Sequence, residues 1–408
     1  MSEPGSPGDP TQPPPPPIHR ELVAEASRRL DAVVALRRRI HAHPETGLDL
    51  PVTQEAVLDG LDGLGLELST GTATTSVVAV LQGDRPGPTT LLRADMDALE
   101  MPEDTGLDFA SGVDGKMHAC GHDGHVAMLV GAARVLADHR TELGRVVLMF
   151  QPGEEGHGGA RIMLDEGLLA AHGRIDRAFA LHLTPNLPSG VVACRPGPML
   201  ASCDEFRIIV TGRGGHASMP HDATDPVPVA CEIVTALQSM VTRVVPAFDP
   251  VVVTVTRIVA GTAFNVIPES VTCEGTIRSV SDASRDLAVT GLLRVAEHVA
   301  AAHRCQAAVE IIADSHYPVT INDDTAAART LSIARDLIGP DRVIRMPTPV
   351  MGAEDWSYVL QEVPGSMAFL GAGPPGVRHP APNHSNRMLI DEPALATGIA
   401  LHAAMALN

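Results

Sequence analysis

Residues 147–155 read Val147-Leu148-Met149-Phe150-Gln151-Pro152-Gly153-Glu154-Glu155. The first four side chains are all apolar, which is typical of a short strand buried on both faces, as in a parallel sheet. The proline and glycine that follow predict a turn at the end of this strand. Two glutamates stand directly after the turn. The segment therefore predicts an α/β fold with an acidic pair at one edge of its sheet.

Further apolar runs of strand length support the same fold. They lie at Ser76–Leu81, Thr90–Ala94 and Ala178–Leu181, and a helical pattern over Val126–Leu136 precedes the strand at 146–150. Buried strands that alternate with helices predict a mostly parallel sheet.

Polar residues stand where these strands are expected to end. Asp95 follows Thr90–Ala94, and His182 follows Ala178–Leu181. In open parallel sheets, ligands bind just beyond the carboxyl ends of the strands. We therefore expect Asp95, His182 and the glutamate pair to meet in one crevice.

The stretch Met117-His118-Ala119-Cys120-Gly121-His122-Asp123-Gly124-His125 lies in the connection after Asp95 and leads into a helix. A thiolate and an imidazole two residues apart can bind one ion, and Gly121 lets the backbone turn tightly enough for both side chains to converge. Neighbouring carboxylates such as Glu154 and Glu155 can divide the work, one binding metal and the other moving protons on a metal-bound water. The pattern indicates a metal site that performs chemistry.

The composition excludes other classes of function. The chain of 408 residues has 30 basic and 49 acidic residues, and its formal net charge of −19 would repel phosphate backbones and anionic membrane surfaces. No uninterrupted apolar stretch reaches the length of a membrane span. We therefore expect neither nucleic acid nor a membrane as a partner.

The cysteines and the N-terminal segment bear on location. The 6 cysteines include no CxxC pair, which is typical of reduced thiols and favours a cytoplasmic protein. Residues 1–19 are rich in proline and lack the apolar core of a signal peptide, so we expect a disordered, partly polyproline tail there.

The length of the chain predicts more than one domain, because it exceeds what a single hydrophobic core usually supports. From about Ser202 the pattern changes to strand, helix, strand, strand, helix, strand, which is the order of the split βαβ in a ferredoxin-like domain. We place this α+β domain at residues 202–317. It is expected to be inserted between two parts of the α/β domain, at residues 20–201 and 318–408.

Five motifs together resemble one known family. They are Arg93-Ala94-Asp95-Met96-Asp97-Ala98-Leu99, Met117-His118-Ala119-Cys120-Gly121-His122-Asp123, Gln151-Pro152-Gly153-Glu154-Glu155-Gly156, Gly214-Gly215-His216-Ala217 and Asn265-Val266-Ile267-Pro268. The chain from about Leu36 to Leu395 is similar to the di-metal amidohydrolases of the aminoacylase and glutamate-carboxypeptidase metallopeptidase superfamily. Within it, the chain most resembles the subgroup of hippurate hydrolase and the plant auxin-conjugate (IAA-amino acid) hydrolases.

The resemblance implies a set of site residues. Two divalent ions would share five ligands, namely Cys120, His122, Glu155, His182 and His384. Glu154 would be the general base, and the inserted domain would dimerise and bring His216 to a neighbouring active site. Behind the ligands, Asp95 and His125 would act as orienting groups. Asn265 and Arg278 are suitable partners for a substrate carboxylate.

The resemblance also implies the reaction and the partners. The expected reaction is hydrolysis of an N-acyl-L-amino acid to a carboxylate and a free amino acid, by a homodimer or homotetramer. A cysteine ligand leaves the metal open, because thiolate favours zinc or cobalt whereas the subgroup also works with manganese or nickel.

Several assignments have ordinary structural alternatives. Taken alone, Cys120 would be a small buried hydrophobe, His384 a surface histidine in a polar loop, and His182 a core histidine with satisfied hydrogen bonds. His125 could face the metals, because it lies three residues from His122 at a helix start. Arg278 could equally pair with a surface acid.

Two functional alternatives also stay open. A dipeptidase or carboxypeptidase would use the same machinery and differ only in its pocket. A non-catalytic metal-binding homologue would use the fold without the chemistry. The second alternative has no need for a non-ligand glutamate beside Glu155.

Overall fold

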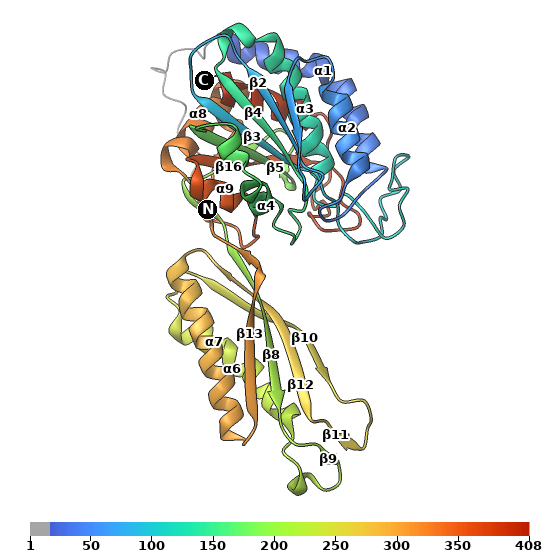
Figure 1. Cartoon of the computed structure of the whole chain (residues 1–408), viewed down its shortest axis with the longest axis vertical. Helices are drawn as coiled ribbons and strands as arrows, with labels where there is room; N and C mark the ends of the chain where they lie inside the picture. The colour runs from blue at the N-terminus through green and yellow to red at the C-terminus, as the bar shows by residue number, and fades with distance from the viewer. Residues whose placement is uncertain (1–16, 408) are drawn as a thin grey trace. The chain divides into compact units, whose positions relative to one another are not determined.

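The structure, a computed structural model, describes residues 17–407, which fall into two compact units (Figure 1). Unit 1 extends to Gly197 and also contains Asn322–Pro347 and the chain from Val359 onward. Unit 2 comprises Pro198–Ile321 and Thr348–Tyr358. The proline-rich tail expected at residues 1–19 lies outside the described residues, except for its end, where the first helix begins.

Unit 1 combines one large sheet with helices. Its helices are α1 (Pro17–His41), α2 (Pro51–Leu61), α3 (His122–Asp138), α4 (Gly159–Asp165), α5 (Leu168–Ala171), α8 (Asp324–Ile338) and α10 (Ala394–Leu407). Its strands are β1 (Glu67–Thr70), β2 (Val77–Gln82), β3 (Thr89–Asp95), β4 (Arg145–Gln151), β5 (Arg177–Pro188), β6 (Val192–Cys194), β15 (Val343–Arg345) and β16 (Gly365–Gly373). At the boundaries between the units, the chain forms β7 (Gly197–Leu200), β14 (Thr320–Asn322) and α9 (Trp356–Glu362).

The eight strands of unit 1 follow the order β1-β2-β4-β3-β5-β16-β6-β15. The central strands β4, β3, β5 and β16 run parallel, whereas β1, β2 and the pairing of β16 with β6 are antiparallel. Strands β2, β3 and β4 carry continuous apolar runs and are buried almost throughout, as expected for strands that are covered on both faces. The prediction of an α/β fold with a mostly parallel sheet is confirmed.

One expectation about the strand ends is wrong. His182 does not end its strand, since β5 continues to Pro188. Pairing with β16 supports this longer strand along most of its length. On its other side, β5 pairs with β3, and the last paired residues are Arg93 and Ala180. Two residues further along each strand, His182 lies level with Asp95, where β3 ends.

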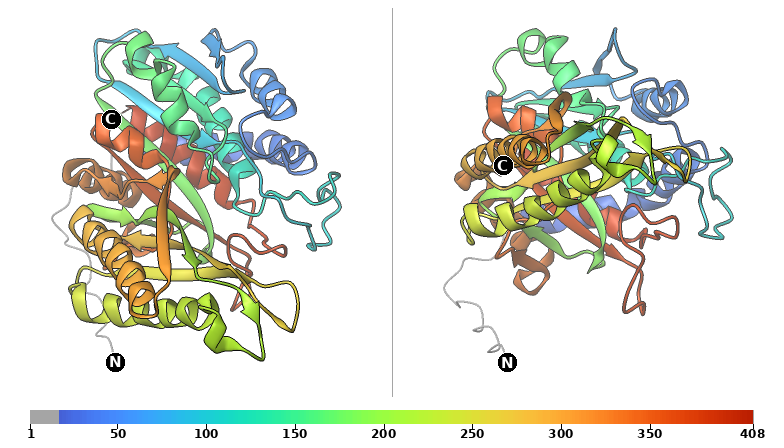
Figure 2. Two further views of the ribbon diagram at one scale, coloured as in Figure 1. Left: turned by 60° about the horizontal axis from the view of Figure 1, so that its bottom comes forward. Right: turned by 90° about the horizontal axis from the view of Figure 1, so that it is seen from below.

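Helices α1, α3, α8 and α10 pack on one another to form a layer of unit 1 (Figure 2). Helix α10 is apolar on all sides and buried almost along its whole length, as expected for a helix inside such a layer. Gly398 permits its close contact with α3, because a Cβ atom there would lie 2.0 Å from the sulfur of Met128.

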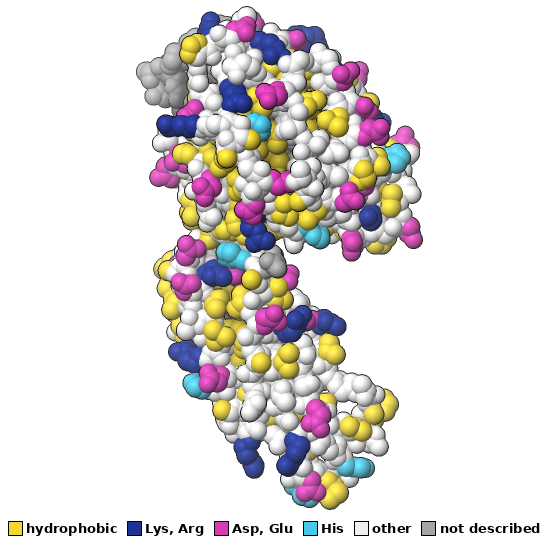
Figure 3. Space-filling model, viewed as in Figure 1, with side chains coloured by type: hydrophobic (Ala, Val, Ile, Leu, Met, Phe, Trp, Pro, Cys, Tyr) yellow, Lys and Arg dark blue, Asp and Glu magenta, His cyan; other side chains and the backbone are white. Residues whose placement is uncertain are grey.

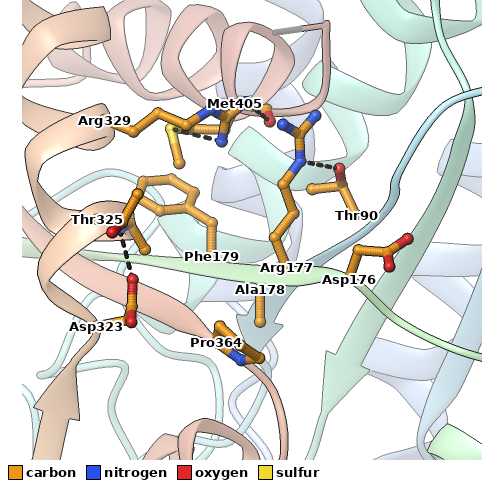
Figure 4. Close-up of a pocket in the computed structure, with 11 residues that line it drawn as sticks. Thr90, Asp176, Arg177, Ala178, Phe179, Asp323, Thr325, Arg329, Pro364 and Met405 are labelled. Atoms are coloured by element: carbon orange, nitrogen blue, oxygen red, sulfur yellow. Dashed lines mark hydrogen bonds between the residues drawn. The ribbon is translucent and has the colours of Figure 1, made fainter.

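A pocket of ≈ 180 Å³ lies at the amino ends of β3, β5 and β16 (Figure 4). Arg177 and Arg329 line the same side of it, and their guanidinium groups donate to the carbonyls of Ala406 and Met405. These arginines thus offset the negative end of the α10 dipole. The pocket is at the opposite edge of the sheet from Glu154.

Unit 2 has the element order expected for the inserted domain. Its main elements are β8 (Ser202–Thr211), α6 (Pro226–Val244), β10 (Val251–Ala260), β12 (Ser270–Ser279), α7 (Asp282–Ala302) and β13 (Gln306–Tyr317). The antiparallel sheet has the order β10-β12-β8-β13, which is the strand order of a ferredoxin-like split βαβ. A small ladder of β9 (Gly215–His216) and β11 (Val266–Ile267) joins two loops of this unit.

Both helices of unit 2 pack against one face of this sheet and leave the other face open. On the open face, four side chains of alternating charge lie in a row across the strands, in the order Arg257, Glu274, Arg207 and Glu310. Each of them forms an ion pair with the next one in the row. Among the described residues, α6 alone is long and apolar enough to suit a membrane span. Its buried side chains belong to the core of unit 2, so it behaves as an amphipathic helix of that unit.

Candidate metal centre

The structure gathers one cluster of metal-binding side chains in unit 1. Its members come from separate parts of the chain and are Cys120, His122, Glu154, Glu155, His182 and His384, in overlapping groups whose ligand atoms lie within 4.8 Å of one another. The Sγ atom of Cys120 is 3.4 Å from Nε2 of His182, and Nε2 of His384 is 3.2 Å from Oε1 of Glu155. All five expected ligands are therefore in one place.

A tight turn presents Cys120 and His122 together. Gly121 between them has φ 92°, a left-handed conformation that favours glycine, and α3 begins at the next residue. The Nδ1 atom of His122 donates to the carbonyl of Asp97 at 2.8 Å. Its Nε2 atom is buried and makes no hydrogen bond among the described residues, although Oδ2 of Asp95 lies 3.4 Å away. A buried ring nitrogen left this way fits a metal ligand.

Asp97 positions the two glutamates. Its Oδ1 atom accepts the backbone N–H of Glu154 and its Oδ2 atom accepts that of Glu155, each at 3.0 Å. This residue was not assigned a role from the sequence. Its position in the sequence, two residues after Asp95 and just beyond the end of β3, could have indicated that it belongs to the site.

His182 and His384 are fixed by backbone contacts. The Nδ1 atom of His182 donates to the carbonyl of Leu183 at 2.7 Å, which leaves Nε2 directed toward Cys120. His384 has φ 66°, an uncommon left-handed conformation for a residue other than glycine, and its N–H donates to the carbonyl of Ala119 at 2.7 Å. Such strain is found at functional sites, where the surrounding structure imposes it.

Asn383, beside His384, is a second residue that the sequence did not single out. Its side-chain amide donates to the carbonyl of Cys120 at 3.0 Å and to that of Leu183 at 3.2 Å. It therefore ties the His384 loop to the segments that carry Cys120 and His182.

His125 and Asp95 lie beside the cluster. The N–H of Leu183 donates to Nε2 of His125 at 2.8 Å, so the proton of this neutral ring is on Nδ1, which is 2.5 Å from Asp95. With both ring nitrogens engaged, His125 has no lone pair left for an ion. Arg93 also donates to Asp95, at 2.7 Å.

The electrostatics around His122 and His384 favour a cation, whereas burial lowers the pKa of His182 to about 3. Hydrogen bonds to Cys120 and Glu155 raise the pKa of His384 to about 10. Burial alone would lower the pKa of His122, but Asp95 and Cys120 raise it well above its usual value. The same negative field would stabilise a divalent ion in place of these protons. The donor set, one thiolate with imidazoles and carboxylates, fits zinc or another divalent transition ion.

The remaining expected site residues lie in unit 2. The Nδ1 atom of His216 accepts from the N–H of Ser218 at 3.1 Å, which leaves an Nε2–H on an exposed ring. The carbonyl of Asn265 accepts from the N–H of Ala217, so Asn265 lies next to His216. Arg278 stands near the other end of β12, eight residues from Ser270, or roughly 25 Å along the strand. Unit 2 thus brings His216 and Asn265 together but not Arg278.

Comparisons with known proteins agree with this geometry. Residues 91–408 match the model of peptidase family M20/M25/M40. The chain is 39% identical to IAA-amino acid hydrolase ILR1-like 2 of Arabidopsis thaliana, covering 94% of this chain and 87% of the relative. It is 37% identical to thermostable carboxypeptidase 1 of Saccharolobus solfataricus, covering 93% and 95%. A Bacillus subtilis structure described as a dinuclear metal binding peptidase from the M20 family matches with a TM-score of 0.79 and 32% identity, covering 94% and 98%.

Replacement of Cys120 tests the cluster. Cys120→Ser is expected to lower bound metal and activity together, because a hydroxyl is a far poorer ligand than a thiolate. Elemental analysis of the purified protein measures the loss. Cys194→Ser is the matched control, since Cys194 is a buried cysteine outside the cluster. Full metal content in the Cys120 variant would refute the assignment.

Proposed function

The chain belongs to peptidase family M20/M25/M40, and we propose that it is a metal-dependent amidohydrolase that cleaves N-acyl-L-amino acids into a carboxylate and a free amino acid. One observation carries the proposal. Two adjacent glutamates stand in a cysteine–histidine cluster, and the backbone N–H groups of both are bound by Asp97. Such a pair suits one metal ligand and one proton carrier.

We propose that two divalent ions, zinc, manganese, cobalt or nickel, bind between Cys120, His122, Glu155, His182 and His384. When bound, these ions would polarise the amide carbonyl and acidify a water molecule. The fit is supported by the buried Nε2 of His122, which makes no hydrogen bond among the described residues, and by the field that raises the pKa values of His122 and His384.

Glu154 is proposed as the group that moves the proton. It accepts a proton from the attacking water and returns it to the leaving amine nitrogen, which makes that nitrogen a good leaving group. Its side chain is only 6% exposed. Low solvent access shields the carboxylate from competing water, so proton exchange with the substrate is favoured.

His216 is proposed as the donor to the oxyanion that forms at the amide carbon. Its Nδ1 is already engaged as an acceptor from Ser218, which makes the exposed Nε2 a donor. Such donors typically contribute about 10²–10³ in rate. Asn265 stands beside it and suits the substrate's α-carboxylate, with Arg278 as a more distant candidate.

We propose that the active unit is a homodimer or homotetramer in which His216 serves a neighbour's metal centre. Apolar side chains are exposed around the His216 ladder, among them Met219, Phe264 and Val266. Hydrophobic and charged side chains are interspersed on the visible surface of unit 2 (Figure 3). Strands β10 and β13 are its sheet edges and can pair with another chain.

A carboxypeptidase is the second candidate, because the chain is 37% identical to thermostable carboxypeptidase 1 over most of both chains. The same cluster would serve that reaction. We also propose a cytoplasmic location, which is supported by the six cysteines that are all free in the structure.

A substrate panel tests the proposed reaction. Acetyl-, benzoyl- and indoleacetyl-amino acids are compared with dipeptides, each with Zn²⁺, Mn²⁺, Co²⁺ and Ni²⁺ in turn, by release of free amino acid. The N-acyl compounds are expected to give the higher kcat/KM. A preference for dipeptides would favour the second candidate, and hydrolysis of neither class would refute both.

Two variants separate the roles of the glutamates. Glu154→Gln is expected to keep both ions and lose about 10²–10⁴ in kcat, since an amide cannot carry the proton. Glu155→Gln is expected to lose metal. Kinetics and elemental analysis on both variants decide, and metal loss confined to the Glu154 variant would show that the roles are reversed.

Mixed subunits test whether His216 acts in trans. His216→Ala and Glu154→Gln subunits, each inactive alone, are mixed under conditions that permit exchange. A trans heterodimer has one site with both lesions and one with neither, so activity is expected at up to half the wild-type rate per dimer. No recovery, with exchange shown by tagged subunits, would reject the trans assignment.

A further inference from the structure

A chain of alternating charges, largely buried and exposed only at Arg38, lies behind the metal centre. In order of contact its members are Glu103, His41, Asp123, Arg37, Glu392 and Arg38, three acids and three bases. No residue of this set was assigned a role above. We call it the charge clamp.

Asp123 is the central member. Its side chain is fully buried, and its Oδ2 atom is 2.8 Å from both Nε of Arg37 and Nδ1 of His41. Asp123 stands directly after His122 in the first turn of α3. Through Asp123, the clamp therefore contacts the start of α3, next to the proposed ligands Cys120 and His122.

Arg37 connects three segments of unit 1. From α1 it donates through Nε to Asp123 and through Nη1 to Glu392, each at 2.8 Å, although only 4% of it is exposed. Glu392 follows His384 by eight residues, and its other oxygen pairs with Arg38 at 2.6 Å. The guanidinium of Arg37 thus spans the distance between the His122 segment and the His384 segment.

His41 makes the third connection. Its Nδ1 contacts Asp123 and its Nε2 is 3.2 Å from Glu103, which lies in the connection that leads to Cys120. Burial would lower the pKa of His41, but Asp123 and Glu103 raise it to about 9, so both ring nitrogens donate at neutral pH. Phe109 of the same connection packs against Arg37, Arg38 and His41.

A purely stabilising role is a weak explanation for this arrangement. Removing two charges from water costs free energy that their attraction often only offsets, so a buried ion pair is poor evidence of added stability. A different property distinguishes the clamp. It joins α1 to the segment that carries Cys120 and His122 and to the segment that carries His384, and these three segments are far apart in the sequence.

We propose that the charge clamp sets the metal affinity of the centre by fixing the position of the Cys120–His122 segment relative to the His384 segment. Arg37 and His41 are positioning residues in this proposal, because they touch neither the proposed ions nor the substrate. The inference rests on the proposed metal site. Groups of this kind typically change metal affinity by about 10–100-fold when they are replaced.

Arg37→Lys tests the clamp with the charge retained. A lysine has one cationic nitrogen group and cannot reproduce the two-sided contact with Asp123 and Glu392. Zn²⁺ affinity, measured by competition with a chromophoric chelator, is expected to fall at least about 10-fold. Glu392→Gln, which removes the charge that bridges both arginines, is the second variant in case Arg37→Lys fails to fold.

Arg285→Lys in unit 2 is the matched control. Arg285 makes two contacts, at 2.8 and 2.5 Å, to Asp204, a fully buried carboxylate outside the metal cluster. It is expected to lose thermal stability without losing Zn²⁺ affinity. Unchanged affinity in folded clamp variants, or an equal loss in the control, would overturn the proposal. Wild-type protein that binds Zn²⁺ but hydrolyses no panel substrate would instead overturn the proposed reaction and leave the clamp standing.

Discussion

One residue, Asp97, connects the proposed chemistry to the fold. Its carboxylate accepts the N–H groups of Glu154 and Glu155, and its carbonyl accepts from His122. Strands β3 and β4 run parallel and end at the same level, so the turn after β3 reaches the turn after β4. The proposed proton carrier, the proposed carboxylate ligand and one proposed imidazole ligand therefore depend on a single residue, through its side chain and its backbone carbonyl.

The sequence predicted the strands of the sheet well, but it did not predict where strand β5 ends. Apolar runs marked β3 and β4, because a strand buried on both faces needs continuous apolar residues. It did not show that β5 continues past His182, since the mixed residues from Leu183 to Pro188 become a strand only by pairing with β16. Tertiary pairing decided that boundary, and no local pattern reports it.

In the site, too, local sequence patterns indicate some residues, whereas only tertiary contacts reveal others. Cys120 and His122 were recognisable as candidate ligands because both stand in one short motif. Asp97 and Asn383 were not, because both act through contacts between a side chain and the backbone of a distant segment. Such hydrogen bonds have no periodicity or characteristic spacing. The separation of Arg278 from Asn265 likewise depends on where β12 begins and ends.

The proposed supports of the cluster are of two kinds, and they differ in physical character. His125 is a neutral ring between Asp95 and the backbone of Leu183, which fixes orientation without adding net charge. The clamp instead alternates full charges around Asp123. In the proposed centre, a thiolate, a carboxylate and divalent ions already concentrate several charges in a small volume. Because the charges of the clamp cancel pairwise, it can hold the ligand segments firmly while adding little to the field at the ions.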